Sequence, residues 1–377
     1  RFDYDPDTGE SLGLLIEEGR TNSFTYSNFA QSTSTAVPTG WDGWNPAAFL
    51  TSQTLSPDGV SFGLFHGAIN TNGGGLRKDL TGLTAGGTYY LSYYVKGLTT
   101  DELTYFTNNN SIGTTTGTAI GASNFAWFAA TKVKFACSNL NGTGASGQSQ
   151  VALTTDWQRV GTVVQADSAG SARIIISNNV GDVGSGNEDE GGTWMIWGAQ
   201  IEAGSFQTSY IPTSGSTFTR QPDNASITGT NFTDFYSGIS NSSIFVECVV
   251  PYTEVGLDPR LLSFRPLSGN ASYDISLLSS QIPTLGLRTA LNIIISSKSI
   301  SPKTSTKISA RLSPGDLALS CDGENAQTST YTLTDNFNAL DIGAFNSSPY
   351  RFINSTIKQL TYYPKRLKDT SLQYLTQ

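Results

Sequence analysis

The sequence is poor in charge, in histidine and in long apolar runs. Only 14% of its 377 residues are charged, one is a histidine, and the formal net charge is −8. A chain with this balance lacks the clustered lysines and arginines that hold a phosphate backbone, so we expect no nucleic-acid partner. No apolar run approaches the roughly 20 residues that span a bilayer, so we expect no membrane insertion.

Cysteine is also scarce. Cys137, Cys248 and Cys321 stand far apart without a C-x-x-C pair, so the sequence signals neither a zinc site nor a disulfide framework. We expect small buried side chains, and the sequence leaves open whether one pair is oxidised.

The single histidine offers little chemistry. His66 lies in "SFGLFHGAIN", without the G-x-S-x-G segment that accompanies many serine nucleophiles. We expect a strand or loop histidine with satisfied hydrogen bonds. A carboxylate pair could hydrolyse a glycan without histidine, but the 30 acidic residues offer too many pairs for any one to be informative. The sequence therefore indicates no catalytic residue, and we expect a protein that is not an enzyme.

Glycine, serine, threonine and asparagine are abundant, and aromatic residues reach 11%. Short β-rich runs separated by turn residues, such as 87–97, 157–166 and 243–252, predict an all-β protein of antiparallel sandwiches or jelly rolls. All six tryptophans precede residue 200, which indicates two different cores. We expect two tandem β-sandwich domains after an N-terminal β-hairpin. The predicted divisions, in chain order, are a hairpin or junction at 1–22, a jelly roll at 23–212, a linker at 213–224 and a second sandwich at 225–377.

The first residues, "RFDYDPDTGESLGLLIEE", resemble a calcium loop only superficially. Counted from Asp3, the glycine falls one place late at Gly9, and Leu14 occupies the place of the bidentate glutamate of an EF-hand. The pattern predicts a turn that closes a hairpin. Leu14 and Ile16 would face one side and Leu15 the other, so we expect both faces to be covered, by the first sandwich or by a neighbouring subunit.

Two features near the end of the chain predict local structure. "DLALSCDGE" is typical of a strand that ends in a hairpin turn at Asp322 and Gly323. Leu367, Leu372 and Leu375 lie near helical spacing, which predicts a short terminal helix.

An acidic, glycine-rich segment at 181–194 could hold a structural calcium ion. Its oxygen-bearing side chains suit the six to eight hard ligands that calcium takes. The same composition fits a solvated loop between strands, and both interpretations stay open. No other cofactor is indicated. The candidate ligands are Asp182, Asn187, Glu188, Asp189 and Glu190.

The tryptophans indicate a candidate glycan contact. Trp41 and Trp44 lie in "VPTGWDGWNP", where proline and glycine oppose a regular strand, and exposed indoles can stack on sugar rings. With Asp42 and Asn45 they form the predicted ligand-binding group; the alternative is packing at the rim of the sandwich. Trp157, Trp194 and Trp197 should be core or half-buried, with Trp194 and Trp197 on opposite faces of a strand.

Three stretches carry a family resemblance. "RFDYDPDTGESLGLLIEEGRTN" (1–22) resembles a segment that recurs in phage tail-fibre and related virion appendage proteins. "IWGAQIEAGSFQTSYIPTSGSTFTRQPD" (196–223) is similar to the segment that closes a carbohydrate-binding-module-like jelly roll in the same proteins. "DLALSCDGEN", "ALDIGAF" and "INSTIKQLTYYPKRLKDTSLQYLT" resemble the closing strands of a laminin-G-like, concanavalin-type sandwich.

The resemblance implies a phage receptor-binding or tail-fibre protein of the virion, built of two lectin-like sandwiches. It implies a homotrimer that joins other virion proteins through an N-terminal part outside this chain, since the chain starts within a structured segment. It also implies multivalent binding to a host-surface polysaccharide. The alternatives are a capsid, neck or baseplate connector that binds only virion proteins, and a glycan depolymerase.

Overall fold

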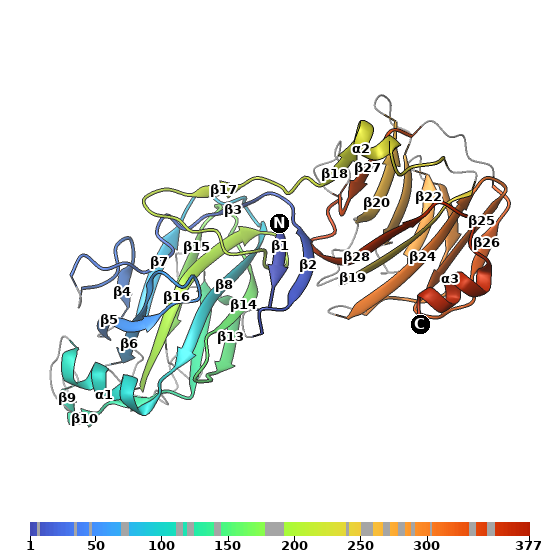
Figure 1. Ribbon diagram of the computed structural model, residues 1–377. Coiled ribbons are helices and arrows are strands. Elements are labelled where there is room, and N and C mark those ends of the chain that lie inside the picture. Colours follow the sequence, from blue (N-terminus) through green and yellow to red (C-terminus); the bar gives the residue numbers. More distant parts are fainter. Residues whose placement is uncertain are drawn as a thin grey trace. The chain divides into compact units, whose positions relative to one another are not determined.

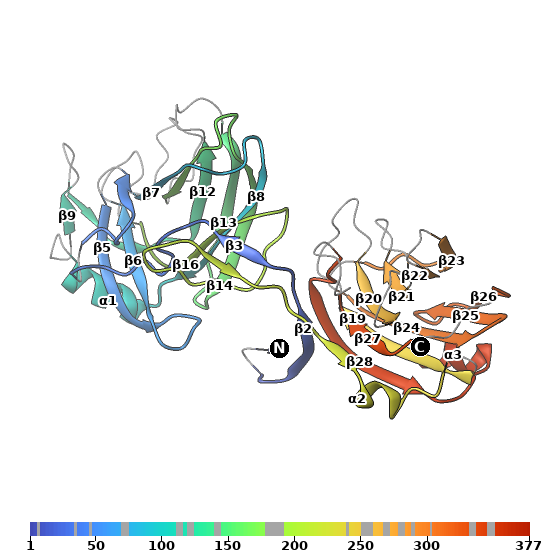
Figure 2. The ribbon, with the colours of Figure 1, turned by 90° about the horizontal axis from the view of Figure 1, so that it is seen from above.

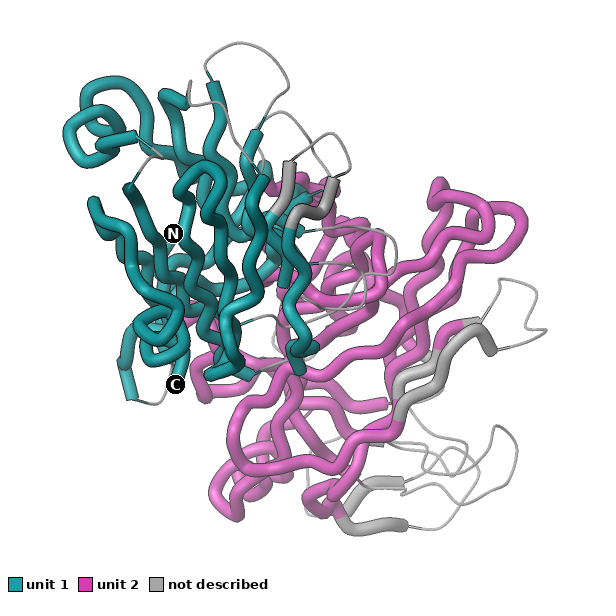
Figure 3. The backbone as a smooth tube through the Cα atoms, turned by 90° about the vertical axis from the view of Figure 1, so that its right-hand side faces the viewer, with its two compact units in different colours: residues 1–19, 221–377 teal, residues 20–220 magenta. Residues whose placement is uncertain are grey.

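The computed structural model (Figure 1) describes most of the chain in two compact units. One unit is residues 20–220, and the other joins residues 1–19 to residues 221–377 (Figure 3). Both consist mainly of antiparallel sheets, which confirms the predicted all-β class. The described residues are 1–5, 8–33, 36–44, 47–68, 75–110, 116–118, 124–138, 145–177, 192–238, 241–249, 259–266, 272–277, 283–287, 291–301, 304–331, 337–344 and 351–377.

The unit of residues 20–220 is a β-sandwich. One sheet has the strand order β14-β8-β16-β6-β5, and the other has the order β13-β12-β15-β7-β4. The elements of the unit are β3 (Arg20–Asn22), β4 (Asp42–Trp44), β5 (Ala47–Leu55), β6 (Phe62–Ala68), β7 (Gly75–Leu80), β8 (Thr88–Gly97), α1 (Thr100–Asn109), β9 (Thr116–Thr118), β10 (Asn124–Ala126), β11 (Phe128–Ala129), β12 (Lys132–Ser138), β13 (Ala145–Ala152), β14 (Gln158–Gln165), β15 (Ala172–Ser177), β16 (Gly192–Ala203) and β17 (Phe218–Arg220).

Side-chain alternation along β8 separates the core of this sandwich from its outer face. Leu91, Tyr93 and Val95 are buried in the cluster between the two sheets, together with Ile174 of β15. The residues between them, such as Tyr94, point to the other face of the sheet because successive side chains of a strand alternate. Trp194 lies in the core and Trp197 on the outer face, which confirms their predicted opposition.

Helix α1 covers part of the outer face. Its Phe106 is fully buried and packs edge-on against Trp127, with ring centroids 5.0 Å apart. The helix starts with a capping box, in which the Thr99 side chain accepts from the Glu102 amide while Glu102 accepts from the Thr99 amide. Glu102 also pairs with Lys96 of β8 at 2.6 Å, which ties the helix to the sheet. The sequence analysis did not anticipate this helix.

The other unit is a second sandwich. Its sheets have the orders β1-β2-β28-β19-β24-β25-β26 and β18-β27-β20-β21-β22-β23. The elements are β1 (Phe2–Tyr4), β2 (Ser11–Ile16), β18 (Ser226–Thr228), α2 (Thr230–Thr233), β19 (Ser243–Val249), β20 (Arg260–Arg265), β21 (Tyr273–Leu277), β22 (Pro283–Leu287), β23 (Leu291–Ile295), β24 (Ser305–Ser313), β25 (Asp316–Cys321), β26 (Gln327–Ser329), β27 (Ala339–Ile342), β28 (Ser355–Tyr363) and α3 (Asp369–Leu375).

The N-terminal hairpin forms as predicted, but its partner differs from the expected ones. Gly9 has φ +70°, and its amide donates to the Asp5 carbonyl at 2.9 Å, which closes the turn. Strand β2 then lies beside β28 and pairs with it (Figure 2). Its Ile16 enters the core of the second sandwich. The face with Leu14 and Ile16 is therefore covered by the second sandwich, not by the first sandwich or another subunit as expected, and cover of the Leu15 face stays a prediction.

The local predictions for the second sandwich are confirmed. Asp322 and Gly323 form the turn between β25 and β26 with φ of 43° and 76°. Helix α3 lies against β24 and β25 (Figure 2). It buries Leu372. No helix in the described part of the chain is long and apolar enough to span a bilayer.

The unit boundaries differ from the predicted ones, which placed a junction at 1–22 and a linker at 213–224. Residues 20–22 belong to the first sandwich because β3 pairs there with β17. The Thr213 amide donates to the Ser27 hydroxyl at 2.8 Å, so the start of the predicted linker is part of that sandwich as well. The chain passes between the units at residues 19–20 and 220–221.

Candidate functional site

The structure places Trp41 in the core rather than on a glycan-binding surface. Its side chain is only 6% exposed and packs against Phe24 and Phe29, with ring centroids 5.0 and 4.7 Å apart. Its indole Nε1 donates to the Tyr26 carbonyl at 2.9 Å. The prediction that Trp41 contacts a ligand is therefore wrong, because two aromatic residues from an earlier segment close over it.

The other predicted site residues lie elsewhere or outside the described residues. Asp42 is exposed on β4 and is 3.7 Å from Arg77. Trp44 ends β4, and Asn45 is outside the described residues. The five candidate calcium ligands, within 182–190, also lie outside them. Within the described ranges, no group of three or more His, Cys, Asp or Glu side chains could hold a metal ion.

His66 is buried, as a strand histidine, but its hydrogen bonds are not satisfied. Neither ring nitrogen has a hydrogen-bond partner among the described residues, and the ring centroid lies 5.0 Å from that of Trp194 and 5.5 Å from that of Phe49. Burial lowers its pKa to about 3, so the imidazole is neutral at physiological pH. The expected hydrogen bonds are wrong, and this neutral ring within an apolar core is not placed for catalysis. The three cysteines are buried, as predicted, and none of them forms a disulfide within the described part of the chain.

A pocket of about 300 Å³ opens at the edge of the first sandwich, and we call it the edge pocket. The segment 28–31 forms one wall and the β5–β6 hairpin the other. Its lining mixes amide and hydroxyl groups with an aromatic ring, since Phe62 is 49% exposed. The lining residues are Asn28, Phe29, Ala30, Gln31, Thr51, Ser61, Phe62, Gly63 and Leu64.

Packing holds one wall of the edge pocket in an unusual backbone conformation. Phe29 has φ +54°, in a region that bulky side chains rarely adopt. The residue is 2% exposed and packs on Trp41, so burial of its ring offsets the strain. Gln31 accepts a hydrogen bond from Thr51 at 2.6 Å, which links the two walls. Trp41 therefore supports the pocket from behind.

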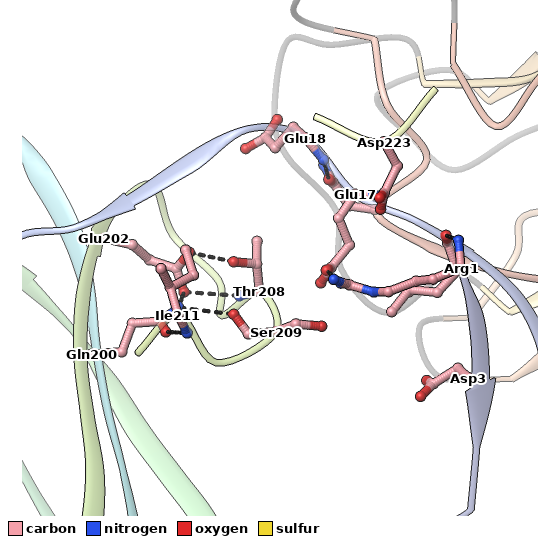
Figure 4. A network of polar contacts seen from close by, with 12 residues as sticks. Arg1, Asp3, Glu17, Glu18, Gln200, Glu202, Thr208, Ser209, Ile211 and Asp223 are labelled. Atoms are coloured by element: carbon pink, nitrogen blue, oxygen red, sulfur yellow. Dashed lines mark hydrogen bonds and ion pairs between the residues drawn. The ribbon is translucent and has the colours of Figure 1, made fainter. Parts of the chain in front are cut away.

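A buried polar network, which we call the closing network, fixes the segment 204–213 next to the sheet. Its members are Asn22, Gln200, Glu202, Thr208 and Ile211. The Glu202 carboxylate is fully buried and accepts from the Thr208 amide at 2.8 Å, the Thr208 hydroxyl at 2.6 Å and the Gln200 amide at 2.8 Å (Figure 4). Gln200 in turn accepts from the Ile211 amide at 2.7 Å. Asn22 bonds both the Ile211 and the Ala199 carbonyls.

The closing network positions a group of rings and one arginine on the outer face of the sheet. The ring centroids of Tyr210 and Trp197 are 4.6 Å apart, and those of Trp197 and Tyr94 are 5.4 Å apart. The Arg159 guanidinium lies 5.5 Å from the Tyr94 ring centre and donates to the Thr208 carbonyl at 2.5 Å. We call Tyr94, Arg159, Trp197 and Tyr210 the Arg159 face.

The edge pocket and the Arg159 face are linked through Ser27. The Ser27 hydroxyl is 2.7 Å from the Tyr210 hydroxyl, and the next residue, Asn28, lines the pocket. Burial raises the pKa of Tyr210 to about 12, so this hydroxyl stays protonated and can donate a hydrogen bond. The combined surface offers rings, amides and hydroxyls but holds no arrangement of nucleophile and base.

Another pocket, of about 390 Å³, lies beside α3 in the second unit. Tyr363, Leu367, Tyr374 and Leu375 dominate its lining, and Tyr374 is 75% exposed. Its polar groups are the hydroxyls of its two tyrosines, Thr370 and Ser371 and the ammonium group of Lys365, with no amide side chain among them. The edge pocket is smaller but richer in directional hydrogen-bonding groups.

Comparisons with known proteins give distant likenesses only. No family model and no curated protein matches the sequence. One of the solved structures to which part of this chain is similar is the Ruminococcus gnavus IT-sialidase CBM40 (12% identity, 37% of this chain and 84% of that chain, TM-score 0.30). A SAP-like pentraxin from Limulus polyphemus is another (12% identity, 36% of this chain and 69% of that chain, TM-score 0.29). A third is domain 4 of the Geobacillus stearothermophilus arabinanase AbnA, in complex with arabinotriose (15% identity, 43% of this chain and 73% of that chain, TM-score 0.31).

Sequence reasoning missed the edge pocket and the Arg159 face. Residues 28–31 and 61–64 are ordinary loop and strand sequence, and nothing local indicates that they meet. One signal was available for the Arg159 face: in "GAQIEAGSFQTSY", glycines flank a glutamine and a glutamate within a β-rich run. Polar residues inside an apolar strand pattern indicate a buried network or a site.

Proposed function

We propose that this protein binds a glycan without chemically altering it, and that it does so as part of a bacteriophage virion appendage. The observation that carries the binding proposal is the edge pocket. Sugars present an apolar ring face together with many hydroxyls, so they fit sites that combine an aromatic ring with amide and hydroxyl groups. Phe62 supplies the ring, and Asn28 and Gln31 supply the amides.

The size of the pocket fits a short contact. A volume of about 300 Å³ is at the small end of ligand sites, enough for one or two sugar units at a chain end or branch. Such a contact is weak by itself. Several linked copies raise the effective concentration, so we propose a homotrimer whose affinity for a host-surface polysaccharide comes from multivalency.

The virion setting has its support in the sequence. The stretches at 1–22 and 196–223 resemble segments of phage tail-fibre and related appendage proteins and occur in the same order. In this proposal the protein joins other virion proteins and does not cleave the glycan. The trimer and the lack of cleavage are open to direct test: the mass of the protein in solution reports the trimer, and new reducing or unsaturated ends in treated polysaccharide would reveal cleavage.

A glycan array with matched variants tests the binding site. We expect Phe62→Ala and Gln31→Ala each to weaken binding by about tenfold, because each removes a contact worth roughly 1 to 2 kcal/mol. Val60→Ala is the control, since Val60 is 79% exposed on the same hairpin but does not line the pocket. Binding that survives both pocket variants, or that Val60→Ala weakens equally, would refute the site. Absence of binding to any glycan would refute the function.

A further inference from the structure

Arg159 keeps unused hydrogen-bonding capacity on the outer face of the sheet. A guanidinium group has five N–H donors. Here Nη1 donates to the Thr208 carbonyl at 2.5 Å and Nη2 to the Ser92 hydroxyl at 3.0 Å, while Nε has no partner in the part of the chain that the structure describes. Each terminal nitrogen therefore retains a second N–H. These two N–H groups form the fork that a carboxylate accepts with both oxygens.

Two other strand arginines, Arg173 and Arg265, show what Arg159 lacks. Arg173 holds Asp79 with two bonds of 2.8 Å, and Arg265 holds Asp341 with bonds of 2.7 and 3.1 Å. Among the residues that the structure describes, no carboxylate pairs with Arg159, and both of its bonds go to neutral oxygens. A half-buried cation without a counter-ion attracts an anion from outside.

The carboxylates that act on this face are already occupied, Glu202 by the Thr208 hydroxyl and the Gln200 side-chain amide and Asp58 by its own turn. Asp58 influences Tyr210 of the same face, but its oxygens accept from the Ser61 amide and hydroxyl, the Val60 amide and the Ser56 hydroxyl. Burial acts to raise its pKa, yet these bonds outweigh burial and lower the pKa to about 2. Asp58 is thus satisfied within its own turn and does not neutralise Arg159.

The surroundings of Arg159 suit a charged sugar better than a small free anion. Tyr94 and Tyr210 are half-buried beside it and offer ring surface to a pyranose. The closing network holds the Thr208 carbonyl, so the guanidinium is fixed before a ligand arrives, which reduces the entropy cost of binding.

We propose that Arg159 forms a subsite for the carboxylate of an acidic sugar, a uronic acid or a related residue, next to the edge pocket. The inference rests on the proposed glycan binding and adds its specificity. A two-pronged contact between Arg159 and the carboxylate provides the selection, and the tyrosines hold the ring.

Calorimetric titration with matched polymers tests this subsite in the full chain. The probes are polygalacturonate, alginate and hyaluronan, each beside its carboxyl-reduced counterpart. We expect at least one acidic polymer to bind about tenfold to a hundredfold more tightly than its reduced form. Arg159→Gln should remove this preference, so that the acidic and the reduced forms of a polymer bind this variant with the same affinity. Arg159→Lys, which keeps the charge but not the fork, should recover only part of it.

Lys132→Gln provides the control for charge, because Lys132 is exposed on the opposite sheet. If Lys132→Gln weakens acidic binding as much as Arg159→Gln, the effect is long-range and the subsite is refuted. Equal binding of acidic and reduced polymers that is lost in Phe62→Ala would overturn the subsite while leaving the proposed function intact. If no polymer binds and the glycan array is also negative, both fail together. Comparison of acidic and reduced ligands on the wild-type chain needs no variant, so it stands even if Arg159→Gln misfolds.

Discussion

The buried carboxylate of Glu202 gives the sharpest prediction about stability. In Glu202→Ala, the backbone N–H of Thr208 and the side-chain amide of Gln200 each lose an acceptor inside the protein. A hydrogen bond to a charged group contributes about 1.5 to 3 kcal/mol, and the three bonds share one acceptor, so they do not add fully. We expect Glu202→Ala to lower the free energy of unfolding by about 3 to 4 kcal/mol.

Glu202→Gln separates geometry from charge. The glutamine oxygen can accept both bonds that Oε1 accepts, and its amide can donate to the Thr208 hydroxyl, which then reverses its role. We therefore expect a loss of only about 1 kcal/mol. Asp156→Ala, which removes an exposed carboxylate from the same unit, should change stability by less than about 0.5 kcal/mol.

Urea unfolding followed by tryptophan fluorescence measures this unit alone, because all six tryptophans precede residue 200 and lie within residues 20–220. With a urea dependence of roughly 1 to 3 kcal/mol per molar, Glu202→Ala should shift the midpoint by more than about 1 M. A shift below about 0.3 M, or equal shifts for the alanine and glutamine variants, would refute the account of the closing network.

Two further predictions concern α1 and the second sandwich. Thr99→Ala removes the capping box of α1 and should lower the stability of the helix by about 1 kcal/mol. Amide hydrogen exchange across residues 100–109 should then become faster. The control is Thr104→Ala, in the exposed middle of the helix, which should speed exchange less than Thr99→Ala does. Burial raises the pKa of Asp274 above its ordinary value of 3.8, although Arg260 lies 3.4 Å away. The folded state then holds this proton more tightly than the unfolded chain, so the second sandwich should lose stability as pH rises above 3.8. Asp274→Asn should flatten that loss in urea titrations followed by circular dichroism, and an unchanged slope would contradict the assignment.

The all-β fold could be predicted because strand alternation and turn residues are patterns within short stretches of sequence. The distribution of the tryptophans along the whole chain added the prediction of two different cores. The Asp322–Gly323 turn and the Trp194–Trp197 opposition follow from backbone geometry alone. Helix α1 carried a readable signal as well, since Thr99 and Glu102 have the spacing of a capping box.

The site could not be predicted, because contacts between distant segments create it. The segment around Trp41 has the composition of an exposed loop, yet Phe24 and Phe29 bury its ring. Asn22 and Ile211 bond across 189 positions of the chain. Two of the three stretches that carry the family resemblance, 1–22 and 196–223, thus meet in one buried network, which explains the polar residues of that network by folding rather than by ligand contact.

A crystal structure of the full chain with the oligosaccharide that binds most tightly on the array tests the central claim most directly. The account predicts a sugar ring against Phe62, with its hydroxyls within hydrogen-bond distance of Asn28 or Gln31. A ligand bound in the second sandwich, or one that leaves the edge pocket empty, would contradict it.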